Sequence, residues 1–229
     1  MNNEFILKVS DLTIELDHQI ILEKLSFSLK QGDIVSILGP NGAGKTVLLK
    51  CLLGLIPYHG EVLWQKGIKI GYVPQRLPFI KDIPLSVREF FALKQASNQV
   101  IEKIISAVGF NAQFLEHRMS DLSSGQFQRL LIAWSLIGKP EVLLFDEPTT
   151  GIDIGGEETI YTLLSHLKKD WFLAMLLVTH DLNVVYQFSN QVICLNKQNA
   201  CMGPPNEVLT PESLQKLYGG GIKYYIHKH

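Results

Sequence analysis

A short apolar run that leads directly into a glycine-rich loop constrains this chain more than any other feature. The run is Ile34–Leu38, which is apolar enough, in spite of Ser36, to predict a strand buried on both faces. The loop follows at Gly39–Thr46, with the sequence Gly-Pro-Asn-Gly-Ala-Gly-Lys-Thr. Apolar spacing over Lys45–Ile56 then predicts a helix that stops before a proline. A strand, a glycine loop and a helix in this order predict an α/β fold with a parallel core.

The glycine loop contains the residues that binding a triphosphate requires. Gly42 and Gly44 allow the backbone to turn its amide groups inward, and the N-terminus of the following helix adds the positive end of its dipole. Lys45 supplies a point charge for the β- and γ-phosphates, and Thr46 offers a hydroxyl to magnesium. The predicted phosphate-binding residues are Gly39, Pro40, Asn41, Gly42, Ala43, Gly44, Lys45 and Thr46. A plain glycine turn between a strand and a helix is the alternative interpretation.

The rest of the chain is organised as strands interleaved with helices. The predicted strands are Phe5–Val9, Leu12–Leu16, Leu25–Leu29, Glu61–Gln65, Glu141–Phe145, Phe172–Val178 and Gln191–Leu195. The predicted helices Ser86–Leu93, Asn98–Val108 and Ser124–Ile137 follow one another without a convincing strand. We therefore expect one domain over residues 1–229, with a helical subdomain at 76–137 inserted in the α/β core. Pro204-Pro205, followed by Gly219–Gly221, predicts a loose C-terminal end.

Composition excludes several classes of protein. The 21 Lys and Arg residues balance 22 Asp and Glu residues, for a formal net charge of -1, so no global basic field favours nucleic acid. The longest apolar runs, Leu130–Ile137 and Trp171–Val178, are far shorter than the ~20 residues that span a bilayer. Met1–Glu4 lacks the basic start of a secretory signal, which predicts a cytosolic protein. Cys51, Cys194 and Cys201 form no Cys-x-x-Cys pair, and this favours buried reduced thiols.

Two adjacent carboxylates end one of the predicted strands. Glu141–Phe145 is followed by Asp146 and Glu147, which places both acids at the carboxyl edge of the sheet, where α/β proteins bind ligands. We expect Asp146 to bind magnesium and Glu147 to polarise the attacking water as a general base. A strand ended by two solvated acids is the alternative.

A third segment, Asp121–Arg129, has the sequence Asp-Leu-Ser-Ser-Gly-Gln-Phe-Gln-Arg. Ser123 at a helix start and free backbone amides at Gly125 and Gln126 predict a second anion site, although the same residues suit a simple helix cap. The segment resembles the Leu-Ser-Gly-Gly-Gln signature of the ATP-binding-cassette (ABC) family, with Ser124 at the position of a glycine. The resemblance extends over nearly the whole chain. It implies a P-loop NTPase core, an N-terminal antiparallel β region and an inserted α-helical subdomain.

The resemblance implies roles for residues outside these three motifs. Gln75 corresponds to a glutamine that reports magnesium and nucleotide state to the helical subdomain. Asp153 belongs to a loop at the dimer seam, and His180 corresponds to a switch histidine that contacts the γ-phosphate and helps align the attacking water. The aromatic residue that usually stacks on adenine is replaced by Leu16, so we expect the base to rest on Leu16 and His18. The implied cofactors are ATP and magnesium, with the metal held by Thr46, Gln75 and Asp146.

Members of this family work as head-to-tail pairs, in which the signature of one subunit closes over ATP held by the glycine loop of the other. One cassette without a membrane span implies separate permease subunits, a metal-binding protein on the outer side, and a peripheral place on the cytoplasmic face of the inner membrane. Within the family, Ile70–Pro78 and Asp82–Val87 are similar to ATPases of the bacterial zinc and manganese uptake group, and the zinc branch resembles them most. His227 and His229 are too few ligands for a zinc site.

Three alternatives stay open at this point. In the first alternative, the chain belongs to an importer of manganese, iron or a chelate. In the second, it is an ABC protein without a transport role. A non-hydrolysing regulatory cassette is the third, and it is disfavoured by four intact residues: Lys45, Asp146, Glu147 and His180. Because Ser124 replaces a glycine of the signature, we expect a changed rate of turnover with ATPase activity retained.

Overall fold

The computed structural model describes residues 5–75, 84–152, 154–196 and 199–219. These residues fall into two compact units, and each unit is described by itself. The first combines the chain up to Lys66 with the chain from Leu176 onward, and the second is Gly67–Met175. The chain therefore leaves the first unit once and returns to it once.

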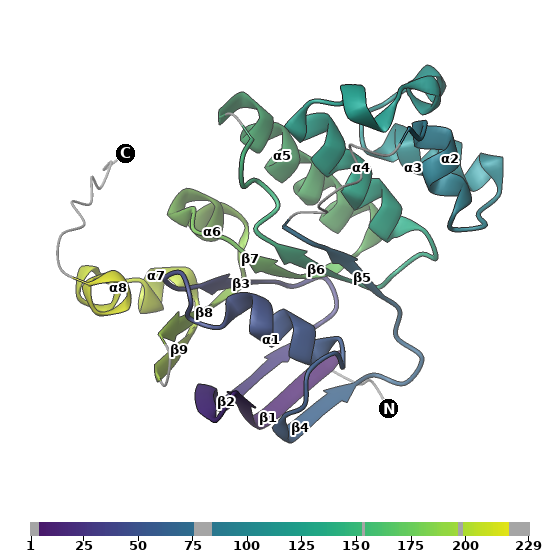
Figure 1. Ribbon diagram of the computed structural model, residues 1–229. Helices are drawn as coiled ribbons and strands as arrows, with labels where there is room; N and C mark the ends of the chain where they lie inside the picture. The colour runs from purple at the N-terminus through teal and green to yellow at the C-terminus, as the bar shows by residue number, and fades with distance from the viewer. Residues whose placement is uncertain (1–4, 76–83, 153, 197–198, 220–229) are drawn as a thin grey trace. The chain divides into compact units, whose positions relative to one another are not determined.

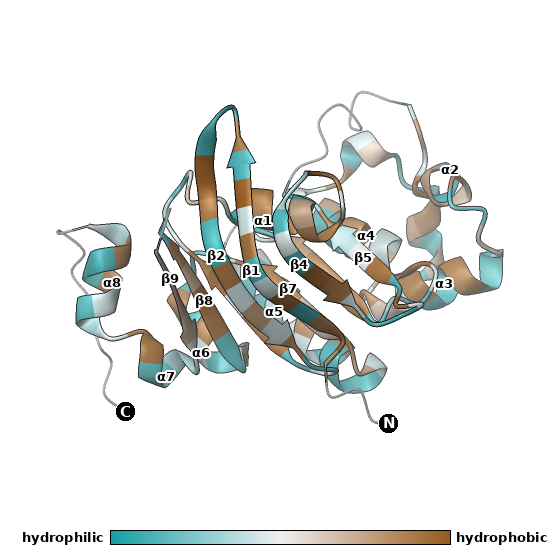
Figure 2. Cartoon of the chain, turned by 90° about the horizontal axis from the view of Figure 1, so that it is seen from below, coloured by the Kyte–Doolittle hydropathy of each residue, from teal (hydrophilic) through white to brown (hydrophobic). Residues whose placement is uncertain are grey.

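The first unit contains an antiparallel sheet of β1 (Leu7–Leu16), β2 (Gln19–Leu29) and β4 (His59–Trp64), in the order β2-β1-β4 (Figure 1). Apolar and polar residues alternate along β1 and β2 (Figure 2), as expected for strands with one buried face. The pairing of β1 with β2 shifts between Val9 and Leu12, which are both buried. The two strands predicted on either side of this shift are therefore one strand with a bulge.

The other strands of the first unit surround β3 (Ile34–Leu38), in which all five residues are buried. Its hydrogen-bonded neighbours are β7 (Ala174–Val178) and β8 (Gln191–Asn196). The pairing of β3 with β8 is parallel, whereas β8 pairs antiparallel with β9 (Asn199–Gly203). The helices of this unit are α1 (Lys45–Leu52), α6 (Leu182–Phe188), α7 (Pro205–Val208) and α8 (Pro211–Tyr218).

The second unit joins two parallel strands, β5 (Ile70–Val73) and β6 (Val142–Asp146), to a group of helices. The helices are α2 (Val87–Ala92), α3 (Asn98–Ala107), the 3-10 turns η2 (Ala112–Glu116) and η3 (Met119–Asp121), α4 (Ser124–Leu136) and α5 (Ile154–Trp171). Phe90 of α2 stacks on Trp134 of α4, with ring centroids 4.0 Å apart. This aromatic contact fixes α2 against α4.

Helix start signals in the sequence explain where the helices of the second unit begin. Ser86 accepts a hydrogen bond from the backbone of Glu89, whose carboxylate returns to the backbone of Ser86, and the pair forms a capping box. Ser97 caps α3 in the same position without the returning carboxylate. Each cap satisfies amide groups that the first turn leaves without an intrahelical partner.

Some expectations from the sequence were wrong. The helix after the glycine loop ends at Leu52 instead of Ile56, because Gly54 turns the chain with a φ of +72°. The loose end predicted after Pro204-Pro205 is helical over much of its described part: Pro205 and Pro211 start α7 and α8, since proline suits the first turn of a helix. The predicted loose end from 220 onward lies outside the described residues. Strands β5 and β9 were not predicted. None of the described helices is both long and apolar enough to cross a membrane.

Candidate functional site

The glycine loop joins β3 to α1 in the first unit, and its glycines occupy positions that other residues fill poorly. A Cβ atom on Gly39 would lie 2.2 Å from the carbonyl oxygen of Leu195 in β8. Gly44 is the N-cap of α1 with a φ of +94°, in the left-handed region, and a Cβ there would meet Ile21 at 2.9 Å. The loop therefore keeps its shape only with glycine at these two positions.

Lys45 is the first residue of α1, and its ammonium group folds back over the loop. Its Nζ atom donates hydrogen bonds to the carbonyl oxygens of Gly39 at 2.9 Å and Pro40 at 3.2 Å. The side chain is buried, so its charge is held at one place above the loop. Thr46 follows it, half-buried, in the first turn of the helix. The positive helix end, the backbone loop and a fixed ammonium group together suit a phosphate chain.

His180 lies beside the end of the strand that leads into this loop. The amide of Thr179, just after β7, donates to the carbonyl oxygen of Ile37 in β3 at 3.3 Å. His180 is exposed, and Asp181 then caps α6 by accepting hydrogen bonds from the amides of Asn183 and Val184. The imidazole is thus presented between a buried strand and a capped helix, in the unit that contains the glycine loop.

Leu16 precedes the two-residue turn between β1 and β2, and His18 is the second residue of that turn. Asp17 and His18 both have positive φ values, +49° and +60°, as a tight hairpin turn requires. Leu16 is half-buried, whereas His18 is exposed, with its Nδ1 atom 3.9 Å from a carboxylate oxygen of Glu15. At this turn, Leu16 therefore offers an apolar side chain and His18 a polar one.

In the second unit, Asp146 ends the fully buried strand β6 and is itself buried. The hydroxyl of Tyr72, in the neighbouring strand β5, donates a weak hydrogen bond of 3.4 Å to its Oδ2 atom. Burial, the charge of Asp146 and this hydrogen bond raise the pKa of Tyr72 to about 12. Tyr72 is therefore a neutral donor to Asp146 at physiological pH.

Glu147 follows Asp146 and is held by two polar side chains. The Nε2 atom of Gln75 donates to the Oε2 atom of Glu147 at 2.9 Å, and the hydroxyl of Thr150 donates to the same oxygen at 3.0 Å. Glu147 has a φ of +48°, a left-handed conformation that is uncommon for a residue with a side chain. Gln75, Glu147 and Thr150 thus form one cluster at the carboxyl ends of β5 and β6.

The Asp121–Arg129 segment is built around the start of α4. Ser123 is the N-cap: its hydroxyl accepts from the amide of Gln126 at 3.2 Å, and the side-chain oxygen of Gln126 accepts from the amide of Ser123 at 2.9 Å. The expectation of a free amide at Gln126 was therefore wrong, because the capping box uses it. The same box fixes the rotamers of both side chains.

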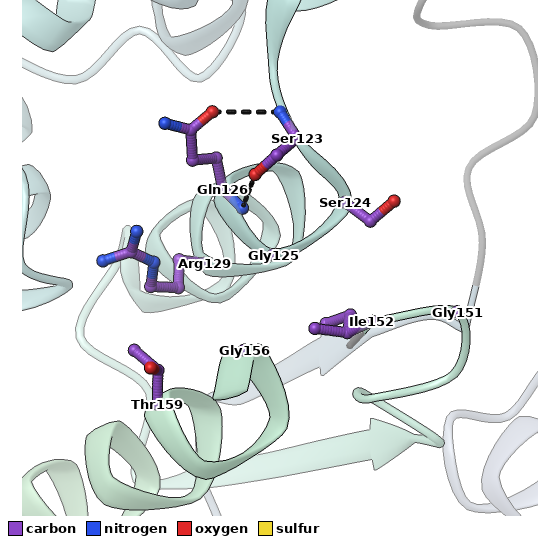
Figure 3. Close-up of a pocket in the computed structure, with 9 residues that line it drawn as sticks. All are labelled: Ser123, Ser124, Gly125, Gln126, Arg129, Gly151, Ile152, Gly156 and Thr159. Carbon is purple, nitrogen blue, oxygen red and sulfur yellow. Dashed lines mark hydrogen bonds between the residues drawn. The ribbon is translucent and has the colours of Figure 1, made fainter. Parts of the chain in front are cut away.

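A cavity of about 380 Å³ lies next to this helix start (Figure 3). Its lining residues come from α4, from the segment after Glu147 and from α5: Ser123, Ser124, Gly125, Gln126, Arg129, Gly151, Ile152, Gly156 and Thr159. A Cβ atom on Gly125 would make only an ordinary contact of 3.7 Å with Ile152. The packing within this unit therefore does not explain why the position is glycine.

Three residues of these clusters were not predicted as site residues: Tyr72, Thr150 and Arg129. The guanidinium of Arg129 lies over the ring of Phe110 at 4.1 Å, and burial lowers its pKa. In the sequence, these three residues were visible only as members of segments already singled out for other residues. Asp153, which was predicted at the dimer seam, lies outside the described residues.

Comparisons with known proteins show which family the chain belongs to. Residues 22–150 match the family model described as ABC transporter. Zinc import ATP-binding protein ZnuC of Pasteurella multocida is 33% identical, covering 98% of this chain and 87% of that protein. The protein of the same name from Buchnera aphidicola is 37% identical, covering 98% and 96%.

A solved structure extends this likeness to three dimensions. CbiO1 from Clostridium perfringens, part of the ABC transporter complex CbiONQ, is 26% identical with a TM-score of 0.80, covering 93% of this chain and 94% of that one. Fold, motifs and relatives thus agree over nearly the whole length. The chain belongs to the ABC transporter family.

Proposed function

We propose that this chain is the ATP-binding and ATP-hydrolysing subunit of an importer that takes up zinc through separate permease subunits. One observation carries the hydrolytic part: the carboxylate of Glu147 is fixed by Gln75 and Thr150 directly after the buried Asp146. A carboxylate held in one orientation is suited to activate a water for attack on a bound phosphate. The choice of zinc as the substrate rests on the names of the relatives.

Nucleotide binding rests on the glycine loop. The inward amides of Gly39–Thr46 and the start of α1 cradle the phosphates, and Lys45 exchanges its two carbonyl partners for the β- and γ-phosphate oxygens. The carbonyl contacts of 2.9 and 3.2 Å hold the ammonium group near the loop before that exchange. Leu16 and His18 contact the base, without an aromatic ring, so discrimination between purine triphosphates is modest.

Three side chains are assigned to hydrolysis. Glu147 accepts the proton of the attacking water, and His180 aligns that water against the γ-phosphate. Gln75 binds Glu147 through its amide nitrogen and thereby links the carboxylate to the nucleotide state. The left-handed backbone of Glu147 limits the directions in which its carboxylate can point.

The side chains assigned to magnesium suit that ion chemically. Thr46, Gln75 and Asp146 offer a hydroxyl, an amide and a carboxylate oxygen, which are the hard donors that magnesium prefers. The amide nitrogen of Gln75 is used by Glu147, so its oxygen is the atom left for a cation. When bound, the ion neutralises charge on the β- and γ-phosphates.

A complete site requires a second copy of the chain. Ser123 and Gly125 at the start of α4 present the positive helix end to the γ-phosphate bound by the other copy, while Gln126 holds Ser123 in place and Asp153 lies at the seam. The open position of Gly125 supports this assignment, because nothing within its own unit requires a glycine. Ser124 is exposed and adds a hydroxyl where the signature has glycine.

Motion is passed to the membrane through the helices between β5 and β6. We assign residues 76–137 to a helical subdomain that docks on the permease, with Gln75 at its entrance. ATP favours the closed pair and hydrolysis releases it. The chain then sits peripherally on the cytoplasmic face of the inner membrane, and a metal-binding protein on the outer side delivers the ion. His227 and His229 lie outside the described residues.

Co-purification from membranes followed by an ATPase assay tests this proposal. The chain is expressed with its chromosomal neighbours, extracted in detergent and reconstituted in vesicles, and turnover is measured with zinc, manganese or iron. The proposal predicts an integral membrane partner and turnover stimulated by zinc above the other metals. Stimulation by manganese, iron or a chelate instead would replace zinc as the substrate, and a soluble partner would contradict transport.

A further inference from the structure

Two cysteines face each other across the hairpin of β8 and β9. Cys194 and Cys201 are partners in the antiparallel register, between the pairs Val192↔Gly203 and Asn196↔Asn199. Both thiols are free in the structure. Neither residue contributes to the nucleotide chemistry described above, so the pair requires its own explanation.

The register places the two residues at the separation that a disulfide needs. Residues directly opposite each other in an antiparallel pair have Cα atoms about 4.5–5.5 Å apart, which lies within the ~4.4–6.8 Å that a disulfide bridges. The two side chains also emerge on the same face of the sheet, because opposite residues point the same way. The two thiols also lie near enough for each to shift the pKa of the other.

Their surroundings give the two thiols different reactivity. A hydrogen bond from Cys194 lowers the pKa of Cys201 to about 7, and the same bond together with burial raises the pKa of Cys194. Cys201 is half-buried and Cys194 buried. Cys201 is therefore the thiolate nucleophile near neutral pH, and Cys194 is a neutral thiol held next to it.

A cavity gives a small oxidant access to the pair. It has a volume of about 600 Å³, and both cysteines line it together with residues of α8 and the segment before it, among them Thr210, Glu212 and Lys216. Cys51 differs: it is buried in α1, and burial raises its pKa to about 11. Cys51 thus serves as an unreactive reference thiol within the same chain.

We propose that Cys194 and Cys201 form a reversible disulfide when the chain meets a hydroperoxide. The thiolate sulfur of Cys201 attacks one oxygen of hydrogen peroxide, the O–O bond breaks, and hydroxide leaves with Cys201 as a sulfenic acid. The sulfur of Cys194 then attacks that sulfenic sulfur, the S–O bond breaks, and water leaves with the thiol proton. One thiolate, one thiol and one peroxide thus give one disulfide, one water and one hydroxide.

Metal binding is the other chemistry open to a pair of thiols, and the structure does not favour it. Across the described ranges, no group of three or more His, Cys, Asp or Glu side chains is placed to hold a metal ion. Two thiols alone leave a tetrahedral ion half coordinated. The pair therefore fits a disulfide better than a metal site.

The position of the pair connects it to the glycine loop. Cys194 is the register partner of Leu38, the residue before Gly39. The carbonyl oxygen of Leu195, the residue after Cys194, occupies the space that a Cβ atom on Gly39 would need. A disulfide at Cys194 therefore forms within one residue of the backbone that shapes the phosphate site.

Thiol counting on the purified full-length chain tests the proposal. The protein is treated with hydrogen peroxide at pH 8, unfolded in guanidinium chloride so that buried thiols can react, alkylated with iodoacetamide and weighed intact. We expect a loss of two hydrogens, one alkylated thiol instead of three, and full reversal by dithiothreitol. Trypsin cleaves after Lys197, between the two cysteines, so the disulfide joins two peptides that are otherwise separate.

Single variants distinguish the two thiols. Cys51→Ser should still form the linked peptides, whereas Cys194→Ser should stop at a Cys201 sulfenic acid that dimedone traps. The rate in the unmodified chain should rise as pH increases through about 7, because only the thiolate attacks. Three alkylatable thiols after treatment, or linkage through Cys51 or between two chains, would overturn the proposal.

Discussion

Removing the hydroxyl of Thr150 should slow ATP hydrolysis without weakening nucleotide binding. Thr150→Val keeps the branched shape but deletes the 3.0 Å hydrogen bond to Glu147. Hydrogen bonds to a charged group contribute about 1.5–3 kcal/mol, and the lower end applies because both residues are half-buried. A loss of about 1.5 kcal/mol in the transition state corresponds to a roughly tenfold fall in kcat.

Two matched variants separate positioning from a general structural effect. Thr150→Ser restores the hydroxyl and should recover most of the rate. Ser165→Ala removes a hydroxyl of the same helix, α5, that donates to the carbonyl oxygen of Tyr161 and should leave kcat unchanged. Phosphate release at saturating ATP gives kcat, and fluorescent-nucleotide titration gives Kd. A Thr150→Val protein with wild-type kcat would refute the positioning of Glu147 by this hydrogen bond.

Four further substitutions have expected outcomes. Glu147→Gln should bind ATP, stall hydrolysis and enrich dimers in size-exclusion chromatography; wild-type turnover would remove Glu147 from its role. Gly39→Ala should lower the free energy of unfolding by about 1–3 kcal/mol in urea melts, because its Cβ would lie 2.2 Å from a carbonyl oxygen; unchanged stability would contradict this close approach. Ser123→Ala should cost about 1 kcal/mol of stability through the lost cap, checked by the same melts. Ser124→Gly should keep the ATPase rate within about tenfold, or ~1.4 kcal/mol, and a larger change would make this serine rate-setting.

The sequence predicted those parts of the fold whose signals are local. The short run Ile34–Leu38, apolar except for Ser36, became β3 with the predicted bounds, and the serines Ser86, Ser97 and Ser123 are the N-caps of α2, α3 and α4. The predicted family and fold class are confirmed as well. These features depend on a few neighbouring residues, so a sequence pattern is sufficient to find them.

The missed strands depend on distant partners. Strand β5 has four residues, including Gly71, where a Cβ atom would lie 2.5 Å from Leu143 and 2.8 Å from the carbonyl oxygen of Ser135. Strand β9 is extended because it pairs with β8, while its own small and polar residues give no strand pattern. Pairing and close approach between segments far apart in sequence decided both elements.

The candidate site shows the same division. Glu147 and Gln75 were found through motifs, but the contribution of Thr150 requires the turn in which Glu147 adopts a positive φ. The reverse holds for Gln126, where the motif predicted a free amide and the helix cap occupies it. Residue types therefore suggest where the chemistry lies, and backbone conformation decides which atoms form the contacts there.

Mixing two inactive variants tests most directly whether the working site is shared between two copies. Lys45→Ala disables the glycine loop, and Ser123→Arg blocks the signature. In a head-to-tail pair, one of the two sites in each mixed dimer is intact, so an equal mixture should regain about a quarter of the wild-type ATPase rate. If the mixture stays as inactive as its components, or if Ser123→Arg alone keeps wild-type turnover, the shared site is contradicted.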